Sequence, residues 1–115
     1  MPRRKLADPL ARRVGQRIGE LRDAAGLTSE KLAFESELGS KGHLSDIENG
    51  RTRPTIRTLK VLADRLGVAL LDLVTFPEED ERQKLIDRTR GLSQAELQRL
   101  LRELDSHKTS RRSGR

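Results

Sequence analysis

Hydrophobic residues recur along this chain at the three- and four-residue spacing of α-helices, and no stretch shows the alternation of a β-strand. The first such segment begins after Asp8 and Pro9, which suit an N-cap and the first helical position. Its inward face would carry Leu10, Val14, Ile18, Leu21 and Ala25. Gly26 follows as a helix stop. The pattern therefore predicts an all-α fold that opens with a long amphipathic helix.

Three more helices are predicted before residue 68, each opened by a side chain that caps helix N-termini. The N-caps are Thr28, Ser40 and Thr55, and the helices end near Ser36, Asn49-Gly50 and Gly67. The inward positions are Leu32, Ala33, Leu44, Ile47, Ile56, Leu59, Leu62, Ala63 and Leu66. Apolar residues over 68–74 predict a short, buried fifth helix, and Pro77 marks the end of this unit.

Residues 77–105 predict a separate helical hairpin. Acidic residues at 78–81 suit the first turn of a helix that ends at Gly91. Ser93 and Glu96 stand at the spacing of a capping box that opens a final helix. The apolar side chains of the two helices are Leu85, Ile86, Leu97, Leu100, Leu101 and Leu104. Two short helices bury a small core by themselves, so we expect these residues to form a dimerisation surface, with packing on the first unit as the alternative.

The composition excludes several classes of protein, because the chain has no Cys, Trp or Tyr and only two His. Disulfide scaffolds, thiol catalysis and Cys-ligated metal sites are excluded, and neither a metal nor a cofactor is expected. Single-strand binders stack bases on aromatic side chains, so the scarcity of aromatics disfavours that class. No apolar run approaches the roughly 20 residues of a membrane span, and the first residues lack a signal peptide's apolar stretch. A cytoplasmic protein without membrane contact is therefore expected.

The formal charge of +6 comes from the two ends of the chain. Residues 1–13 and 106–115 each carry a net charge of +4, whereas 14–76 are neutral and 77–105 carry −2. Residues 106–115 also lack apolar periodicity, so a disordered basic tail is expected there. These ends favour non-specific attraction to phosphates, but total charge does not locate a binding site.

The central segment contains several motifs in a fixed order: Arg17-Ile-Gly-Glu-Leu-Arg22, Gly26-Leu-Thr-Ser-Glu-Lys-Leu-Ala33, Leu44-Ser-Asp-Ile-Glu-Asn-Gly-Arg51 and Leu62-Ala-Asp-Arg-Leu-Gly-Val68. They closely resemble the helix-turn-helix domains of the phage repressor/Cro (XRE-like) family over residues 12–76. The resemblance implies a compact five-helix domain that binds double-stranded DNA, usually as a dimer, with its third helix in the major groove. No triad-like arrangement of Ser, His and Asp is visible, and no enzymatic activity is expected.

By position in that family, the exposed start of the third helix would read bases. Those residues are Ser40, Lys41, Gly42, His43 and Asp46. Lys41 suits guanine and Asp46 a cytosine amino group, while Gly42 permits close approach. Phosphate contacts would come from Thr28, Ser29, Asn49, Arg51 and Arg53. Arg22 and Glu48 match a pair of charges that meet inside the domain and fix the first helix against the third.

Two positions depart from the family pattern. Ser29 stands where a Gln often braces a phosphate contact, and Glu37 stands where the turn before the third helix has Gly. Gly39 follows two residues later, so this turn is expected to be one residue longer than usual.

The predicted organisation is a basic N-terminal arm with the start of the first helix over 1–11, a DNA-binding domain over 12–76, a dimerising hairpin over 77–105 and a disordered basic tail over 106–115. The predicted function is transcriptional regulation, by a repressor that binds a palindromic operator as a homodimer. Two alternatives are an antitoxin-type DNA-binding protein that holds a second protein through 77–105, and a protein-interaction adaptor without DNA binding. The neutral segment 14–76 and Ser29 favour the adaptor.

Overall fold

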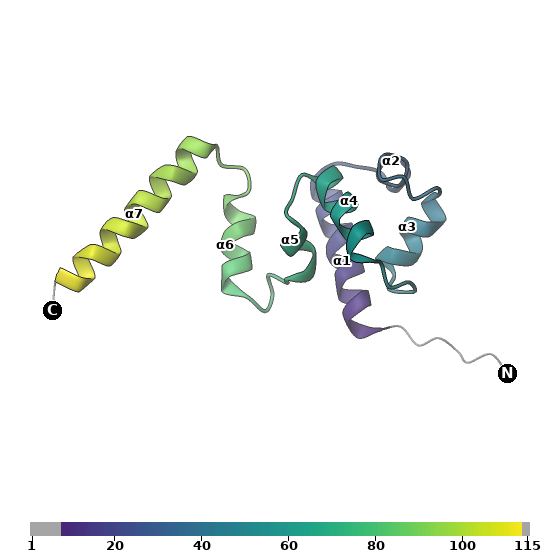
Figure 1. The fold of residues 1–115 in the computed structure, drawn as a ribbon, viewed down its shortest axis with the longest axis horizontal. Coiled ribbons are helices and arrows are strands. Elements are labelled where there is room, and N and C mark those ends of the chain that lie inside the picture. The colour runs from purple at the N-terminus through teal and green to yellow at the C-terminus, as the bar shows by residue number, and fades with distance from the viewer. Residues whose placement is uncertain (1–7, 114–115) are drawn as a thin grey trace. The chain divides into compact units, whose positions relative to one another are not determined.

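The computed structural model describes residues 8–113, with side chains as far as residue 108. These residues form seven helices and no strand (Figure 1), so the predicted all-α class is confirmed. The helices are α1 (Pro9–Ala24), α2 (Ser29–Glu35), α3 (Lys41–Glu48), α4 (Ile56–Leu66), α5 (Leu70–Val74), α6 (Glu81–Thr89) and α7 (Gln94–Ser113). The chain divides into two compact units, residues 1–76 and 77–115. The basic arm over residues 1–7 lies outside the described residues.

The predicted N-caps begin four of the five helices of the first unit. Thr28 Oγ1 accepts a hydrogen bond from the amide of Lys31 (3.0 Å), and Ser40 Oγ accepts one from the amide of His43 (3.2 Å). The same bond opens α4, from Thr58 N to Thr55 Oγ1 (3.1 Å). Asp8 caps α1 by accepting from the amide of Leu10 (2.9 Å). Each cap satisfies amides that have no partner within the helix and thereby fixes where the helix starts.

A single hydrophobic core joins the five helices of the first unit. The large hydrophobic side chains without exposed surface are Ile18, Leu32, Leu44, Ile47, Leu62 and Leu73. All six come from predicted inward positions or, for Leu73, from the predicted apolar segment 68–74. Burying one such side chain contributes about 1.5–3 kcal/mol, so the core supplies most of the favourable free energy of folding.

Five positions that the apolar pattern places in the core are exposed instead. Leu10 and Ile56 are 60% and 74% exposed, although both continue the apolar stripe of their helix. Side chains lean toward the N-terminus of a helix, so those in a first turn extend past its end. In α5, Leu71 and Val74 are 60% and 40% exposed, because a five-residue helix presents only one side to the core. Ala25, at the end of α1, is exposed as well.

The backbone of α1 packs directly against the end of α3. A Cβ atom at Gly15 would lie 2.1 Å from the carbonyl oxygen of Ile47 and 2.7 Å from that of Glu48. A Cβ atom at Gly50, just after α3, would lie 2.6 Å from Cα of Arg12. No larger side chain fits at either position, so these two glycines set the distance between the helices.

Buried polar contacts hold α5 against α1. The Arg17 side chain is 5% exposed, and its Nε donates to the carbonyl oxygen of Asp72 (3.1 Å). The guanidinium of Arg13 stacks on Phe76, with Cζ 4.1 Å from the ring centroid. The last segment of the first unit is therefore fixed to its first helix.

The turn between α2 and α3 spans residues 36–40. Glu37 has a φ of +58° and Gly39 a φ of +88°, so two residues adopt the left-handed conformation between the helices. Glu37 is the only non-glycine residue with positive φ in the described part of the chain. A side chain in this conformation costs about 1–2 kcal/mol, whereas glycine adopts it freely.

Replacing Glu37 with Gly should therefore stabilise the protein, by up to about 1 kcal/mol after the greater entropy of unfolded glycine is subtracted. Urea unfolding followed by circular dichroism measures the change. The matched control is Gly39→Ala, which introduces a Cβ where no other atom lies within 4 Å and so tests the backbone angle alone. It should destabilise, and a loss of stability in the Glu37 variant would contradict the account.

The second unit consists of α6 and α7. Asp80 caps α6, so residues 78–79 precede the helix instead of forming its first turn as predicted. The predicted capping box opens α7: Ser93 N donates to Glu96 Oε1 (2.9 Å) and Glu96 N donates to Ser93 Oγ (3.1 Å). The bond from the Ser93 amide, followed by that with its side chain, lowers the pKa of Glu96. The charged carboxylate is the form that caps the helix.

The predicted disordered tail is wrong for most of its length, since α7 continues to Ser113. Once a helix is nucleated, each added residue gains a backbone hydrogen bond and needs no apolar stripe. Within the part of the chain that the structure describes, no helix is both long and apolar enough to cross a membrane.

Candidate nucleic-acid interface

Helix α3 has one face in the core and one face at the surface. Leu44 and Ile47 are completely buried, as predicted for its anchoring positions. Ser40, Lys41, Gly42 and His43, which were predicted to read bases, are all exposed. The first turn of α3 is therefore available to a ligand, while its apolar residues hold the helix in place.

The predicted pair of Arg22 and Glu48 is present and fixes α3 against α1. Arg22 Nε donates to Glu48 Oε2 (2.8 Å), and Nη2 donates to Oε1 (3.3 Å). Nη1 donates to the carbonyl oxygen of Leu27 (3.0 Å), so the fork also holds the loop before α2. Both side chains are about 15% exposed. The hydrogen bond to Glu48 raises the pKa of Arg22 further above its ordinary value, and the cation persists at every accessible pH.

The first turn of α3 places two chemically different side chains, those of Lys41 and His43, at the surface. Among the described residues, the Lys41 side chain has no hydrogen-bond or ion-pair partner. His43 Nδ1 lies 3.2 Å from the carbonyl oxygen of Leu38, which only a protonated Nδ1 can satisfy. In the neutral ring, Nε2 is then an acceptor.

Gly42 differs from the packing glycines of this domain. A Cβ atom at Gly42 would meet only Ser40 Oγ, at an ordinary 3.7 Å. Glycine within a helix costs about 0.5–1 kcal/mol relative to alanine. Nothing in the fold of the free protein requires glycine at this position.

At the other end of α3, the side chains that were predicted to contact DNA already have partners within the protein. Asp46 Oδ1 accepts from Arg51 Nε (3.0 Å), and Asn49 Nδ2 donates to the carbonyl oxygen of Ser45 (2.8 Å). Asn49 therefore caps α3. Arg53 Nε lies 3.0 Å from Asp8 Oδ2. The sequence predicts the capping role of Asp8. It does not predict the ion pair with Arg53, because the two residues are far apart in the chain and share no motif.

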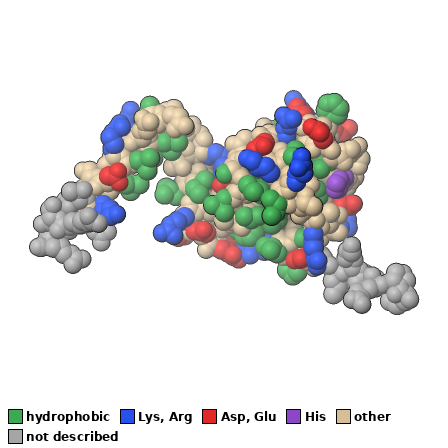
Figure 2. Space-filling view, viewed as in Figure 1, with side chains coloured by type: hydrophobic (Ala, Val, Ile, Leu, Met, Phe, Trp, Pro, Cys, Tyr) green, Lys and Arg blue, Asp and Glu red, His purple; other side chains and the backbone are tan. Residues whose placement is uncertain are grey.

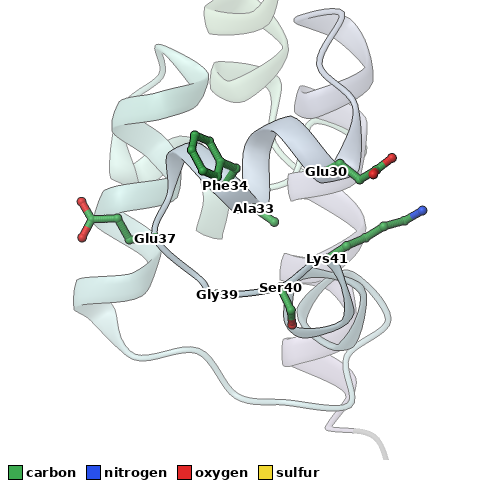
Figure 3. Close-up of a pocket in the computed structure, with 7 residues that line it drawn as sticks. All are labelled: Glu30, Ala33, Phe34, Glu37, Gly39, Ser40 and Lys41. Carbon is green, nitrogen blue, oxygen red and sulfur yellow. The ribbon is translucent and has the colours of Figure 1, made fainter.

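Helix α2, the turn after it and the start of α3 line one shallow depression of about 540 Å³ (Figure 3). Glu30 and Lys41 extend on the same side of it, and Glu37 extends on the opposite side. Phe34, which also lines it, is 85% exposed. Thr28 is exposed and Ser29 half-buried at the start of α2, next to Glu30. Because the carboxylates of Glu30 and Glu37 line the depression, it does not suit phosphate.

No group of three or more His, Cys, Asp or Glu side chains suited to a metal ion occurs within the described residues. Figure 2 shows basic and acidic side chains interspersed over the visible face of the first unit, around a patch of hydrophobic ones. This mixture agrees with the neutral net charge of residues 14–76.

Comparison with known proteins identifies the domain. A helix-turn-helix family model matches residues 18–73. An uncharacterised HTH-type transcriptional regulator of Sinorhizobium fredii, y4dJ, is 42% identical over 66 residues, which are 57% of this chain and 84% of the relative. The immunity repressor of Bacillus phage phi105 is 39% identical over 61 residues, 53% of this chain and 42% of that protein. This chain belongs to the XRE-type helix-turn-helix family of transcriptional regulators.

The solved structures extend the likeness of this XRE-type protein beyond the DNA-binding domain. The complex of the SinR and SinI proteins matches with a TM-score of 0.55 and 29% identity. That match covers 84% of this chain and 98% of the other, so it includes part of the second unit. The predicted all-α fold with a repressor-like helix-turn-helix domain is confirmed.

Removal of the Glu48 carboxylate should destabilise the XRE-type domain. Glu48→Ala leaves the largely buried Arg22 without its partner, and we expect the free energy of unfolding to fall by about 2 kcal/mol. Urea unfolding measures the loss. Asp64→Ala is the control, because Asp64 forms an exposed pair with Lys60 at 2.9 Å, and such pairs contribute under about 1 kcal/mol. Equal losses in the two variants would show that the Arg22–Glu48 pair does not hold the helices together.

Proposed function

We propose that this regulator is a repressor that recognises a specific sequence of double-stranded DNA, a palindromic operator, as a homodimer. Membership of a DNA-binding family supports the class of ligand. The observation that carries the proposal is the first turn of α3, which is exposed and contains a glycine that the fold does not need. A likeness to a phage immunity repressor supports repression as the mode of action.

Base recognition is assigned to the first turn of α3, where Ser40, Lys41, Gly42 and His43 lie. Lys41 donates to guanine O6 or N7 in the major groove. The Nε2 acceptor of neutral His43 suits the amino group of adenine or cytosine. Gly42 brings the backbone of α3 close to the base edges. Lys41 and His43 thus supply a hydrogen-bond donor and an acceptor from the same turn of α3.

Phosphate contacts are assigned to both sides of this turn. Thr28 and Ser29 lie at the start of α2, before this turn, and Asn49, Arg51 and Arg53 follow it at and after the end of α3. Arginine donors bind phosphate oxygens in charge-assisted pairs, whereas the amides and hydroxyls supply neutral hydrogen bonds. The basic ends of the chain add sequence-independent affinity that falls with salt.

The direct test is selection of bound duplexes from a random pool by the full-length protein. A single enriched sequence with two inverted half-sites is expected, with half-site centres roughly one helical turn apart or a multiple of it. Enrichment of a single unrepeated half-site would contradict the palindrome. No enrichment at all would favour the adaptor alternative.

Gly42→Ala should change stability and DNA affinity in opposite directions. The free protein should gain about 0.5–1 kcal/mol, because alanine favours the helix and finds room at this position. Affinity for the selected duplex should fall at least roughly tenfold, because the methyl group keeps the backbone from the bases. Thermal unfolding and fluorescence anisotropy measure the two quantities.

The matched control is Gly19→Ala in α1, where a Cβ atom meets Glu48 at an ordinary 3.5 Å. This variant should gain stability and keep its affinity. If Gly42→Ala binds the duplex as tightly as the wild type, the first turn of α3 does not approach the bases.

The second unit is assigned to dimerisation through residues 77–105. Its exposed side chains include Leu85, Ile86, Leu100, Leu101 and Leu104, and Leu97 is half-buried. Large hydrophobic side chains gathered on a hairpin mark an interaction surface. A second copy of the chain presents the same surface, which suits the two-fold symmetry of a palindrome.

A second candidate for the hairpin is the binding of another protein. The likeness to the SinR–SinI complex favours it, since the matched structure is a complex of two proteins. In that case the wild-type chain would be monomeric by itself, and the same leucines would bind the partner.

Replacing Leu101 and Leu104 with Asp in the full-length chain should weaken the dimer by on the order of 100-fold, because each buried leucine contributes about 1.5–3 kcal/mol. Sedimentation equilibrium measures the dissociation constant. Leu71→Asp is the control, since Leu71 of α5 is as exposed as Leu101, at 60% and 59%. Loss of the dimer in the Leu71 variant alone would show that the dimer interface lies in the first unit instead.

A further inference from the structure

Two arginines that follow α3 are each held by a carboxylate through Nε. Arg51 Nε lies 3.0 Å from Asp46 Oδ1, and Arg53 Nε lies 3.0 Å from Asp8 Oδ2. The Arg51 and Asp46 side chains are 59% and 48% exposed. Ion pairs this exposed contribute little to stability, so the main consequence of the pair is the orientation of the guanidinium.

The geometry of the Arg51 guanidinium leaves its terminal amino groups available. A guanidinium has five N–H donors in a rigid plane, and the bond from Nε occupies one of them. The remaining donors are those that form paired bonds with a phosphate. An arginine already held by one edge loses less side-chain freedom when a phosphate binds to the others.

The backbone also brings Asp46 and Arg51 together. Arg51 N donates to the carbonyl oxygen of Asp46 (2.9 Å), so the chain turns back over the end of α3. Gly50 permits the turn with a φ of +74° and packs against Arg12 so closely that no Cβ fits. Asp46 and Arg51 are thus brought together by a turn that the packing of α1 on α3 enforces.

We propose that Asp46 is a positioning residue for DNA binding: it acts through Arg51, whose guanidinium it orients toward a phosphate, and it does not read a base. This inference rests on the proposed DNA-binding function and replaces the base-reading role that the family pattern implies for Asp46. An Asp46 that accepted from cytosine would have to share or release Arg51.

Two accounts predict opposite changes in DNA affinity when the Asp46 carboxylate is removed. A negative charge at a DNA interface repels phosphates, so its loss should strengthen binding. If Asp46 positions Arg51, its loss should weaken binding, because the arginine must then be ordered by the DNA itself. The sign of the change therefore separates the two accounts.

The experiment compares full-length wild type, Asp46→Asn, Arg51→Gln and the double variant on the selected duplex. Asp46→Asn should weaken binding by about two- to tenfold, the cost of ordering one long side chain. Arg51→Gln should weaken it further and reduce the salt slope by about one. The double variant should bind like Arg51→Gln alone, because Asp46 has no role without the arginine.

Two readouts exclude a merely structural effect. The base preference of Asp46→Asn, measured by repeating the selection, should match that of the wild type. Asp64→Asn is the control for loss of a surface carboxylate, since Asp64 pairs with Lys60 in α4 at 2.9 Å. Its affinity should stay at or slightly above the wild-type value.

The inference is overturned if Asp46→Asn binds more tightly, if its preferred base changes at one position, or if its effect is the same with and without Arg51. It is also overturned if Arg51→Gln binds like the wild type. Failure of the wild-type protein to enrich any duplex is a different result, which removes the proposed function itself and the inference with it.

Discussion

The contact between the backbone of α1 and the carboxyl end of α3 is the constraint on which the rest of this domain depends. At Gly15 and Gly50 the two segments lie too close for any Cβ atom. Arg22 of α1 then reaches Glu48 at the end of α3 and binds it with two donors. The orientation of α3 is thus set by backbone packing and secured by one partly buried ion pair. The core leucines add free energy, but they are compatible with more than one helix orientation.

This constraint divides the charged residues of the domain into two groups. Arg22 and Glu48 are largely buried, bonded on both sides and unavailable to a ligand. Arg51 and Arg53 are exposed, and each is paired with a carboxylate through Nε alone, so their terminal N–H groups remain available to a ligand. A neutral domain can therefore present local cationic groups, because Glu48 is paired with the largely buried Arg22 while Asp46 and Asp8 each hold an exposed arginine in place. Net charge is a poor guide to such a site, whereas the position of each pair is informative.

The sequence predicts the helices and their order well, because caps and apolar spacing act locally. Ser40, Thr55 and the Ser93–Glu96 box each begin a helix where expected. The sequence is a poor guide where the burial or the partner of a side chain depends on residues that are distant in the chain. Leu10 and Ile56 continue apolar stripes, but their side chains extend past the ends of their helices, and α7 continues beyond its stripe. The pairing of Asp8 with Arg53 joins positions 45 residues apart, so no motif contains it. The Arg22–Glu48 pair was predictable only through the family resemblance.

The central claim is that α3, held by α1, presents its first turn and the segment after it to DNA. Backbone amide chemical shifts of the labelled full-length protein, recorded during titration with the selected duplex, test it most directly. The account predicts the largest changes at residues 40–43 and 49–53, and small changes over α4 beyond its first turn and over α6. Changes confined to the second unit or to the ends of the chain, with residues 40–43 unmoved, would contradict it.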